Sequence, residues 1–193
     1  MKRPTTRSKE STHERIVDAG ARAIRRFGFD GIGIADIMKL AGLTHGGFYA
    51  HFASREVMLA ELVDRAGAEA VETFLRIVAA APTGKSQQAL LRAYLSQEHV
   101  KNPESGCPVA SLGTDLSRQS PAIRRAATRR IKDLLSIVSR HATDREQPDA
   151  DARALVTAAT MIGAVVLARA VDEEALSEAV LSATRAHLVP ETD

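Results

Sequence analysis

The sequence predicts an all-α fold with about nine helices: an N-terminal three-helix helix-turn-helix domain and a larger C-terminal helical domain. Alanine is abundant, runs of β-branched residues are rare, and apolar residues recur three and four positions apart almost throughout. That spacing places apolar side chains on one helix face, and alanine is the strongest helix former. We place the boundary between residues 1–54 and 55–193, because the chain is long enough for one small and one larger domain.

Start and stop signals set the expected helix limits. Ser11-Thr12-His13-Glu14 has the spacing of a capping box, and Gly28 follows as a stop signal. Ser54 is a candidate cap, and Ser120-Pro121 places a proline in a first helical turn. On these signals we expect helices at about 11–27, 34–40, 45–51, 55–80, 85–101, 109–117, 121–141, 150–170 and 173–188.

The net charge of +2 conceals an asymmetry between the two ends of the chain. Residues 1–56 hold ten Lys/Arg and six Asp/Glu, whereas residues 57–193 hold sixteen and eighteen. A basic end on a near-neutral body suits an anionic partner such as nucleic acid. A merely solvated basic tail would give the same excess.

Composition also bears on the compartment and on membranes. The single cysteine, Cys107, excludes an internal disulfide and fits a reducing cytoplasm, where we expect the protein to be. Residues 1–7 have no apolar stretch behind their positive charges, so we expect no signal peptide. The apolar run at 154–168 is shorter than the roughly 20 residues of a membrane span, so we expect a buried helix there and no membrane partner.

The segment 33–52 has the features of a helix-turn-helix. Gly42 allows a tight turn, Thr44 can cap the second short helix, and that helix then contains Gly46-Gly47. Each of these two glycines costs roughly 1 kcal/mol against alanine in a helix, and close approach of the backbone to DNA would explain both. Apolar residues on the inner faces would fix the angle between the helices: Ile34, Ile37, Met38, Leu43, Phe48 and Phe52.

The outward positions of this segment are the candidate DNA contacts. We expect Thr44, His45, Gly46, Tyr49 and His51 to face outward, where hydroxyl and imidazole groups can reach phosphates or base edges. The alternative is that Tyr49 is half-buried packing and that the two histidines are ordinary surface residues.

Residues 16–62 resemble the N-terminal domain of the tetracycline-repressor (TetR/AcrR-type) family of bacterial transcriptional regulators. The resemblance lies in Ala19-Gly20, Phe27-Gly28-Phe29, Asp36-Ile37, Ala41-Gly42-Leu43-Thr44, Gly46-Gly47-Phe48-Tyr49-Ala50-His51-Phe52 and Ser54-Arg55-Glu56 with Leu59. It covers about a quarter of the chain, and the combination is specific although no single element is.

The resemblance implies a dimeric repressor whose third helix reads a palindromic operator in double-stranded DNA. The larger domain would bind an unknown small-molecule effector and release the DNA. DNA contacts would come from Thr44, His45, Gly46, Tyr49 and His51, with a phosphate contact from Arg55. The last two helices, about 150–170 and 173–188, would form the homodimer as a four-helix interface, although by residue pattern alone they could close the monomer's own core. Activation instead of repression remains open.

Three residues depart from the family pattern. Gly33 and Ala35 stand where a Ser/Thr cap and an arginine are common, which should weaken DNA binding modestly. His45 stands where lysine is common, which should make binding more sensitive to pH.

The C-terminal half offers candidate ligand contacts at helical spacing. A cavity there and a filled core are both consistent with the pattern. The candidate lining residues are Phe74, Leu91, Tyr94, Leu95, Cys107, Leu112 and Met161.

Cys107 follows Gly106 and precedes Pro108, where a loop is expected to enter a short helix. A helix N-terminus lowers the pKa of a thiol, so Cys107 could make the protein a redox- or electrophile-sensing regulator. Free cysteine is more often a small buried hydrophobe, and we favour that interpretation.

Two other classes of function are alternatives to a ligand-controlled regulator. An enzyme is not expected, because the sequence has no Gly-rich phosphate loop, no two-histidine metal spacing and no nucleophile elbow. We therefore expect no catalytic residues, no metal and no cofactor. A DNA-binding protein controlled by a protein partner remains an alternative to control by a small ligand.

Overall fold

The computed structural model describes residues 6–142 and 146–189, and every regular element among them is helical. The N-terminal part contains α1 (Thr6–Phe27), α2 (Ile34–Leu40) and the 3-10 helix η1 (His45–Ala50). The C-terminal part contains α3 (Arg55–Ala80), α4 (Ser86–Tyr94), α5 (Gln97–Lys101), η2 (Pro103–Ser105), α6 (Pro108–Leu116), α7 (Pro121–His141), α8 (Ala150–Ala170) and α9 (Glu174–Leu188).

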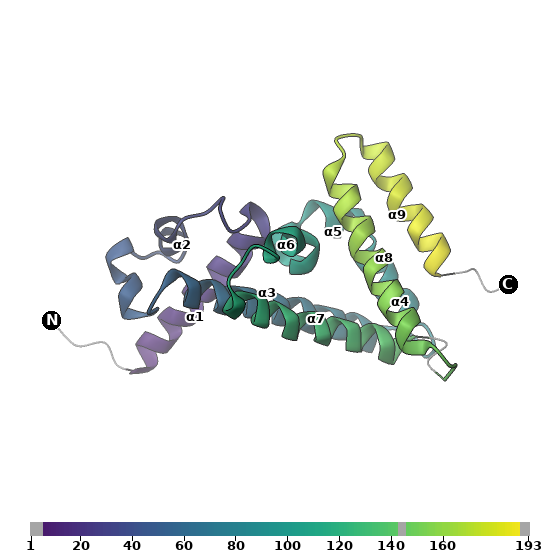
Figure 1. The fold of residues 1–193 in the computed structure, drawn as a ribbon, viewed down its shortest axis with the longest axis horizontal. Helices are drawn as coiled ribbons and strands as arrows, with labels where there is room; N and C mark the ends of the chain where they lie inside the picture. The colour runs from purple at the N-terminus through teal and green to yellow at the C-terminus, as the bar shows by residue number, and fades with distance from the viewer. Residues whose placement is uncertain (1–5, 143–145, 190–193) are drawn as a thin grey trace.

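Two long helices, α3 and α7, lie side by side along the molecule and connect its two ends (Figure 1). The helices α1, α2 and η1 lie at one end, and α8 and α9 form a helical hairpin at the other. The first half of α3 packs into the core of the helix-turn-helix end through Met58, Leu59 and Leu62, and its second half packs into the C-terminal core through Phe74 and Val78. A movement of α3 would therefore change the packing in both cores.

Glycine sets how closely α1 approaches α3. A Cβ atom on Gly20 would lie 2.7 Å from Cδ1 of Leu62, which is closer than real Cβ contacts come. The absence of a side chain lets the two helices meet at this point. Gly28 ends α1 with a φ of +76°, and Gly42 makes the turn after α2 with a φ of +70°, as the sequence predicts.

Several helix limits differ from the predicted ones. The helix α1 begins at Thr6 instead of near residue 11, because nothing between Thr6 and Glu10 breaks a helix, so the predicted capping box lies inside it. The predicted helix 85–101 is divided at Leu95, whose ψ of 51° leaves the helical region. Ser96 then starts α5, its Oγ accepting from His99 N–H at 3.2 Å.

Of the other predicted signals, those at Ser54 and Pro121 act as expected, whereas the cap at Thr44 does not form. The Ser54 hydroxyl accepts from Val57 N–H at 3.2 Å and caps α3, and Pro121 stands in the first turn of α7. Thr44 occupies the cap position of η1, but its side chain makes no cap hydrogen bond. Phe27, the last residue of α1, is 50% exposed.

The apolar run at 154–168, expected to be a fully buried helix, is buried on one face only. Among the described residues, α8 is the one helix long and apolar enough to cross a membrane by length and composition, which is weak evidence. Only 28% of its apolar window is buried within the chain. Val156 and Leu167 on its open face are 64% and 58% exposed. This exposed apolar face needs another explanation.

Candidate DNA-binding surface and effector core

The orientation of η1 is fixed by a buried aromatic pair. Phe48 and Phe52 stack with ring centroids 5.6 Å apart, and both side chains are almost fully buried. Ile37 and Met38 of α2 belong to the same core. Because these contacts hold the inner face of η1, its outer face is presented in one orientation.

The outer face of η1 is open to solvent. Thr44, His45, Gly46 and Tyr49 are all exposed, and Tyr49 is 75% exposed. A Cβ atom on Gly46 would meet nothing within 4 Å. Folding therefore does not require a glycine at this position, whereas close approach of a nucleic-acid backbone would. The expected outward placement of these four residues is confirmed, and DNA contact stays a prediction.

His51 lies differently from the other predicted contacts. Its ring is half-buried beside His13, with centroids 6.0 Å apart, and its Nδ1 is buried without a hydrogen-bond partner in the described structure. Burial lowers the pKa of His51 below its usual value, and the charges of His13 and Lys9 lower it further. A neutral imidazole is a weaker phosphate ligand than an imidazolium, so His51 offers less to DNA than the sequence suggests.

Arg55 has a structural partner that the sequence does not reveal. One of its terminal nitrogens donates to the Phe29 carbonyl at 2.6 Å, which ties the start of α3 to the corner between α1 and α2. Gly33, which lacks the side-chain cap common in the family, donates its N–H to the Asp36 carboxylate at 3.2 Å. Asp36 thus provides part of a cap for α2 in another way.

Arg25 connects the two parts of the molecule and was missed in the sequence. It is only 3% exposed and donates to the Glu69 carboxylate at 2.5 Å, the Ala66 carbonyl at 3.2 Å and the Gly106 carbonyl at 3.5 Å. These contacts join α1 to α3 and to the loop before α6. A buried arginine on an otherwise apolar helix face gives no periodic signal, so only the fold reveals it.

The predicted ligand residues form a closed core. All seven are buried, at 6% exposure or less: Phe74, Leu91, Tyr94, Leu95, Cys107, Leu112 and Met161. Leu112 belongs to the helix-turn-helix core, and the other six belong to the C-terminal core. Contact of these residues with a ligand stays a prediction.

Polar groups surround Cys107 within this core. His99 accepts the Cys107 N–H at its Nε2 at 3.0 Å and places its Nδ1 2.6 Å from the Tyr94 carbonyl, as a donor. A Cβ atom on Gly106 would lie 2.5 Å from the His99 ring, so the glycine is needed for this close approach. Arg169 donates to the His99 carbonyl at 2.6 Å and to Ser111 Oγ at 2.9 Å.

Burial also perturbs the acid–base chemistry here. Burial raises the pKa of Tyr94 well above its usual value, and the neighbouring Cys107 thiol raises it further. The Tyr94 hydroxyl is buried without a hydrogen-bond partner among the described residues. Burial lowers the pKa of His99 to about 4, and the nearby Arg169 charge lowers it too, against the raising effect of the Tyr94 carbonyl. His99 is therefore neutral at pH 7.

The lowered pKa of His99 predicts that acid destabilises the fold. The unfolded chain protonates this imidazole near pH 6.5 and the folded chain near pH 4. The unfolded state therefore binds more protons between these values, and the free energy of unfolding decreases as the pH is lowered. The loss between pH 7 and pH 5 is about 2 kcal/mol. Denaturant unfolding at both pH values measures it. His99→Gln should remove this loss, and equal losses in both proteins would refute the assignment.

Comparisons with known proteins now bear on this geometry. Residues 16–62, which span the helix-turn-helix, match the model of bacterial regulatory proteins of the tetR family. The match shows a DNA-binding domain of the tetR-family type at this end of the chain. The chain is 33% identical over 57 residues to the uncharacterized HTH-type transcriptional regulator YwcC of Bacillus subtilis (strain 168). That match spans 30% of the chain and 26% of the relative.

Solved structures extend the similarity to nearly the whole fold. A TetR transcriptional regulator from Chloroflexus aurantiacus is 26% identical, with 96% of this chain and 98% of that one covered and a TM-score of 0.79. The reduced form of E. coli NemR is 21% identical, with 93% and 95% covered and a TM-score of 0.75. The all-α fold with an N-terminal helix-turn-helix is thereby confirmed, and this fold and the names of the similar proteins support a DNA-binding transcriptional regulator.

Proposed function

We propose that this regulator is a repressor that binds a palindromic operator as a homodimer and leaves it when a small effector binds the C-terminal part. The observation that carries the proposal is the open face of η1, where Thr44, His45, Gly46 and Tyr49 stand on a rigid aromatic core. Small polar and glycine positions on an exposed short helix suit the major groove.

Dimerisation through α8 and α9 would cover the apolar surface that the single chain leaves exposed. Leu155, Val156, Leu167 and Leu176 are between 46% and 64% exposed. Exposed apolar residues concentrated on neighbouring helices mark an interaction site. A two-fold dimer would place two copies of η1 on the same face of DNA, roughly 34 Å apart.

The contacts of Arg25 support a route from the C-terminal part to the DNA. The Gly106 carbonyl, next to the polar group around His99, accepts from Arg25 on α1. A rearrangement of this loop would change a contact of the helix that supports η1. Such a coupled element is what an effector needs in order to alter DNA affinity.

Selection of bound DNA from a random pool by the full chain tests the proposal. We expect an enriched palindrome whose half-site centres are about 10 base pairs, or a multiple of this, apart. Enrichment of no motif would refute operator recognition, and a single unrepeated half-site would refute the dimeric mode. The location of the palindrome relative to promoters distinguishes repression from activation.

Operator binding is expected to tighten between pH 8 and pH 6 at constant salt. His45 is exposed on η1 at the position where lysine is common in the family, and imidazole is the side chain that responds to pH near neutrality. Two new charge-assisted contacts per dimer predict a change of about five- to tenfold. Fluorescence anisotropy of the selected DNA measures it. A flat titration, or one that His45→Gln does not flatten, would contradict the role of His45.

A second candidate function is sensing of oxidants or electrophiles by Cys107. It is favoured by the setting of the thiol, next to Tyr94 and His99 and near the positive charge of Arg169. Against it, Cys107 is only 2% exposed, as expected for a structural cysteine. Intact mass after N-ethylmaleimide or mild peroxide, with and without operator DNA, decides between them. An unmodified thiol under conditions that modify a denatured sample would exclude sensing.

A further inference from the structure

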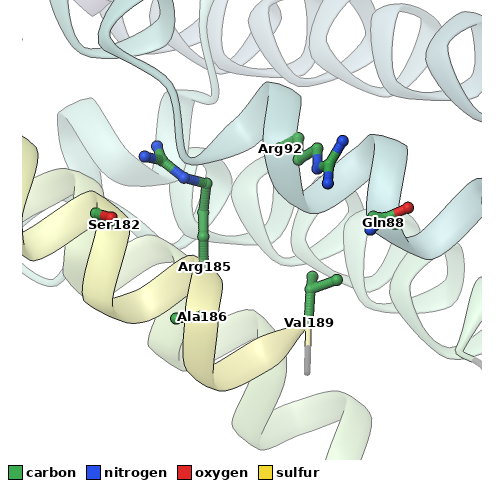
Figure 2. Close-up of a pocket in the computed structure, with 6 residues that line it drawn as sticks. All are labelled: Gln88, Arg92, Ser182, Arg185, Ala186 and Val189. Atoms are coloured by element: carbon green, nitrogen blue, oxygen red, sulfur yellow. The ribbon is translucent and has the colours of Figure 1, made fainter. Parts of the chain in front are cut away.

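A groove between α4 and α9 lies apart from the proposed DNA-binding surface. Its volume is about 450 Å³, which lies in the range of small-molecule sites. Figure 2 shows that the groove is bordered by two side chains of α4 and by residues at the C-terminal end of α9. The lining residues are Gln88, Arg92, Ser182, Arg185, Ala186 and Val189.

The charged side chains that line this groove are cationic. Both ionisable residues that line it are arginines, and no carboxylate lines it. Arg185 is held by the Leu95 carbonyl at 2.5 Å and by Glu178 at 2.7 Å. Arg92 is exposed and has no hydrogen-bond or ion-pair partner within residues 6–142 and 146–189. Arg92 therefore offers a free guanidinium to a ligand, beside an Arg185 whose terminal nitrogens already donate to Leu95 and Glu178.

The remaining lining groups define the kind of ligand. Gln88 and Ser182 supply neutral hydrogen-bonding groups, while Ala186 and Val189 supply an apolar wall. Guanidinium groups bind carboxylates and phosphates through paired N–H donors. We infer that the groove binds a small organic anion with one oxyanion head group and a short aliphatic chain.

The position of the groove gives such binding a consequence. The helix α4 packs on α3, and α9 packs on α8, whereas α4 and α9 contact each other only along this boundary. An anion held by Arg92 from one side and by Arg185 from the other would fix α4 relative to the α8–α9 pair. This inference rests on the proposed function, since it names the effector class of the C-terminal part.

Isothermal titration of the full chain without DNA tests the inference, with hexanoate, hexyl phosphate and uncharged hexanamide as probes. We expect at least one anion to bind at least about tenfold more tightly than hexanamide. The stronger of the two anions assigns the head group as carboxylate or phosphate. Equal affinity for all three probes, or no anion binding up to ~10 mM, would overturn the inference.

Matched variants locate the site. Arg92→Gln removes the free guanidinium from an exposed position and should weaken binding of the preferred anion about tenfold. Gln88→Glu adds a negative charge to the same wall, which repels an anion, and should weaken binding of the preferred anion by a similar factor. Arg76→Gln, an exposed arginine on α3 outside the groove, is the control and should change nothing. An Arg92→Gln protein that binds as tightly as the control would place the anion elsewhere.

Failure of this inference can be told apart from failure of the proposed function. Anion binding is measured without DNA, and DNA binding is measured separately by anisotropy on selected DNA. If the protein binds DNA but no anion, only the inference about the effector class is refuted. If it binds the anion but no DNA, the anion site stands and the proposed operator binding is refuted.

Discussion

A chain carrying both Val156→Glu and Leu167→Glu is expected to be monomeric and to bind operator DNA at least about 100-fold more weakly than the wild type. The two residues are 64% and 58% exposed, and their separation of eleven positions places them on one face of α8. Thr160 and Gly163 lie between them on the same stripe, and a Cβ atom on Gly163 would meet nothing within 4 Å. Four new carboxylates at a two-fold interface would have to be buried without partners.

Light scattering gives the mass directly, with 20.7 kDa expected for the double variant and about twice this for the wild type. Leu75→Glu is the matched control, because Leu75 is 44% exposed but lies on α3, away from α8 and α9. The control should remain dimeric with unchanged DNA affinity. A double variant that stays dimeric would place the interface elsewhere.

Tyr49→Ala is expected to weaken operator binding about 100-fold, because each half-site would lose a contact of roughly 1.4 kcal/mol. The side chain is 75% exposed, and the one ring contact found for it is an edge contact with Phe48 at 5.0 Å. The melting temperature should therefore stay close to that of the wild type. Anisotropy on selected DNA gives the affinity, and differential scanning calorimetry gives the melting temperature.

Leu40→Ala is the control for Tyr49→Ala. Leu40 is also on the surface of the helix-turn-helix, at 58% exposure, but it lies on α2 and outside the outer face of η1. Its replacement should leave operator affinity nearly unchanged. If both variants bind equally well, or lose affinity equally, η1 is not the reading element.

Much of the helix-turn-helix could be predicted from the sequence because its signals are local. Gly28 and Gly42 have the positive φ that a helix end and a tight turn need, and the spacing of Phe48 and Phe52 places both in the core. The cap of α3 at Ser54 is local as well. In each case the residue type and its immediate neighbours decide the structure.

The features that could not be predicted depend on contacts between distant residues. Arg25 is buried because Glu69 and two carbonyls from other elements surround it. Arg55 is drawn to the Phe29 carbonyl, which lies 26 positions earlier in the chain. Periodicity and capping rules contain no information about such partners.

The C-terminal hydrophobic core also shows what the sequence can and cannot predict. The pattern of apolar residues from Phe74 to Met161 predicts that they come together, and six of the seven candidates do. It does not distinguish a cavity from a filled core, because both use the same inward face. The arginine-lined groove between α4 and α9 gives no sequence signal, since Arg92 and Arg185 lie far apart in the chain and each looks like an ordinary surface arginine.

Gly46→Ala shows whether the outer face of η1 touches DNA. A methyl group at this position meets open space in the folded protein, and alanine is favoured over glycine in a helix by up to about 1 kcal/mol. We therefore predict an equal or higher melting temperature together with operator binding that is at least about tenfold weaker, measured on the selected DNA. Wild-type affinity in Gly46→Ala would contradict the account, because DNA would then not approach this surface.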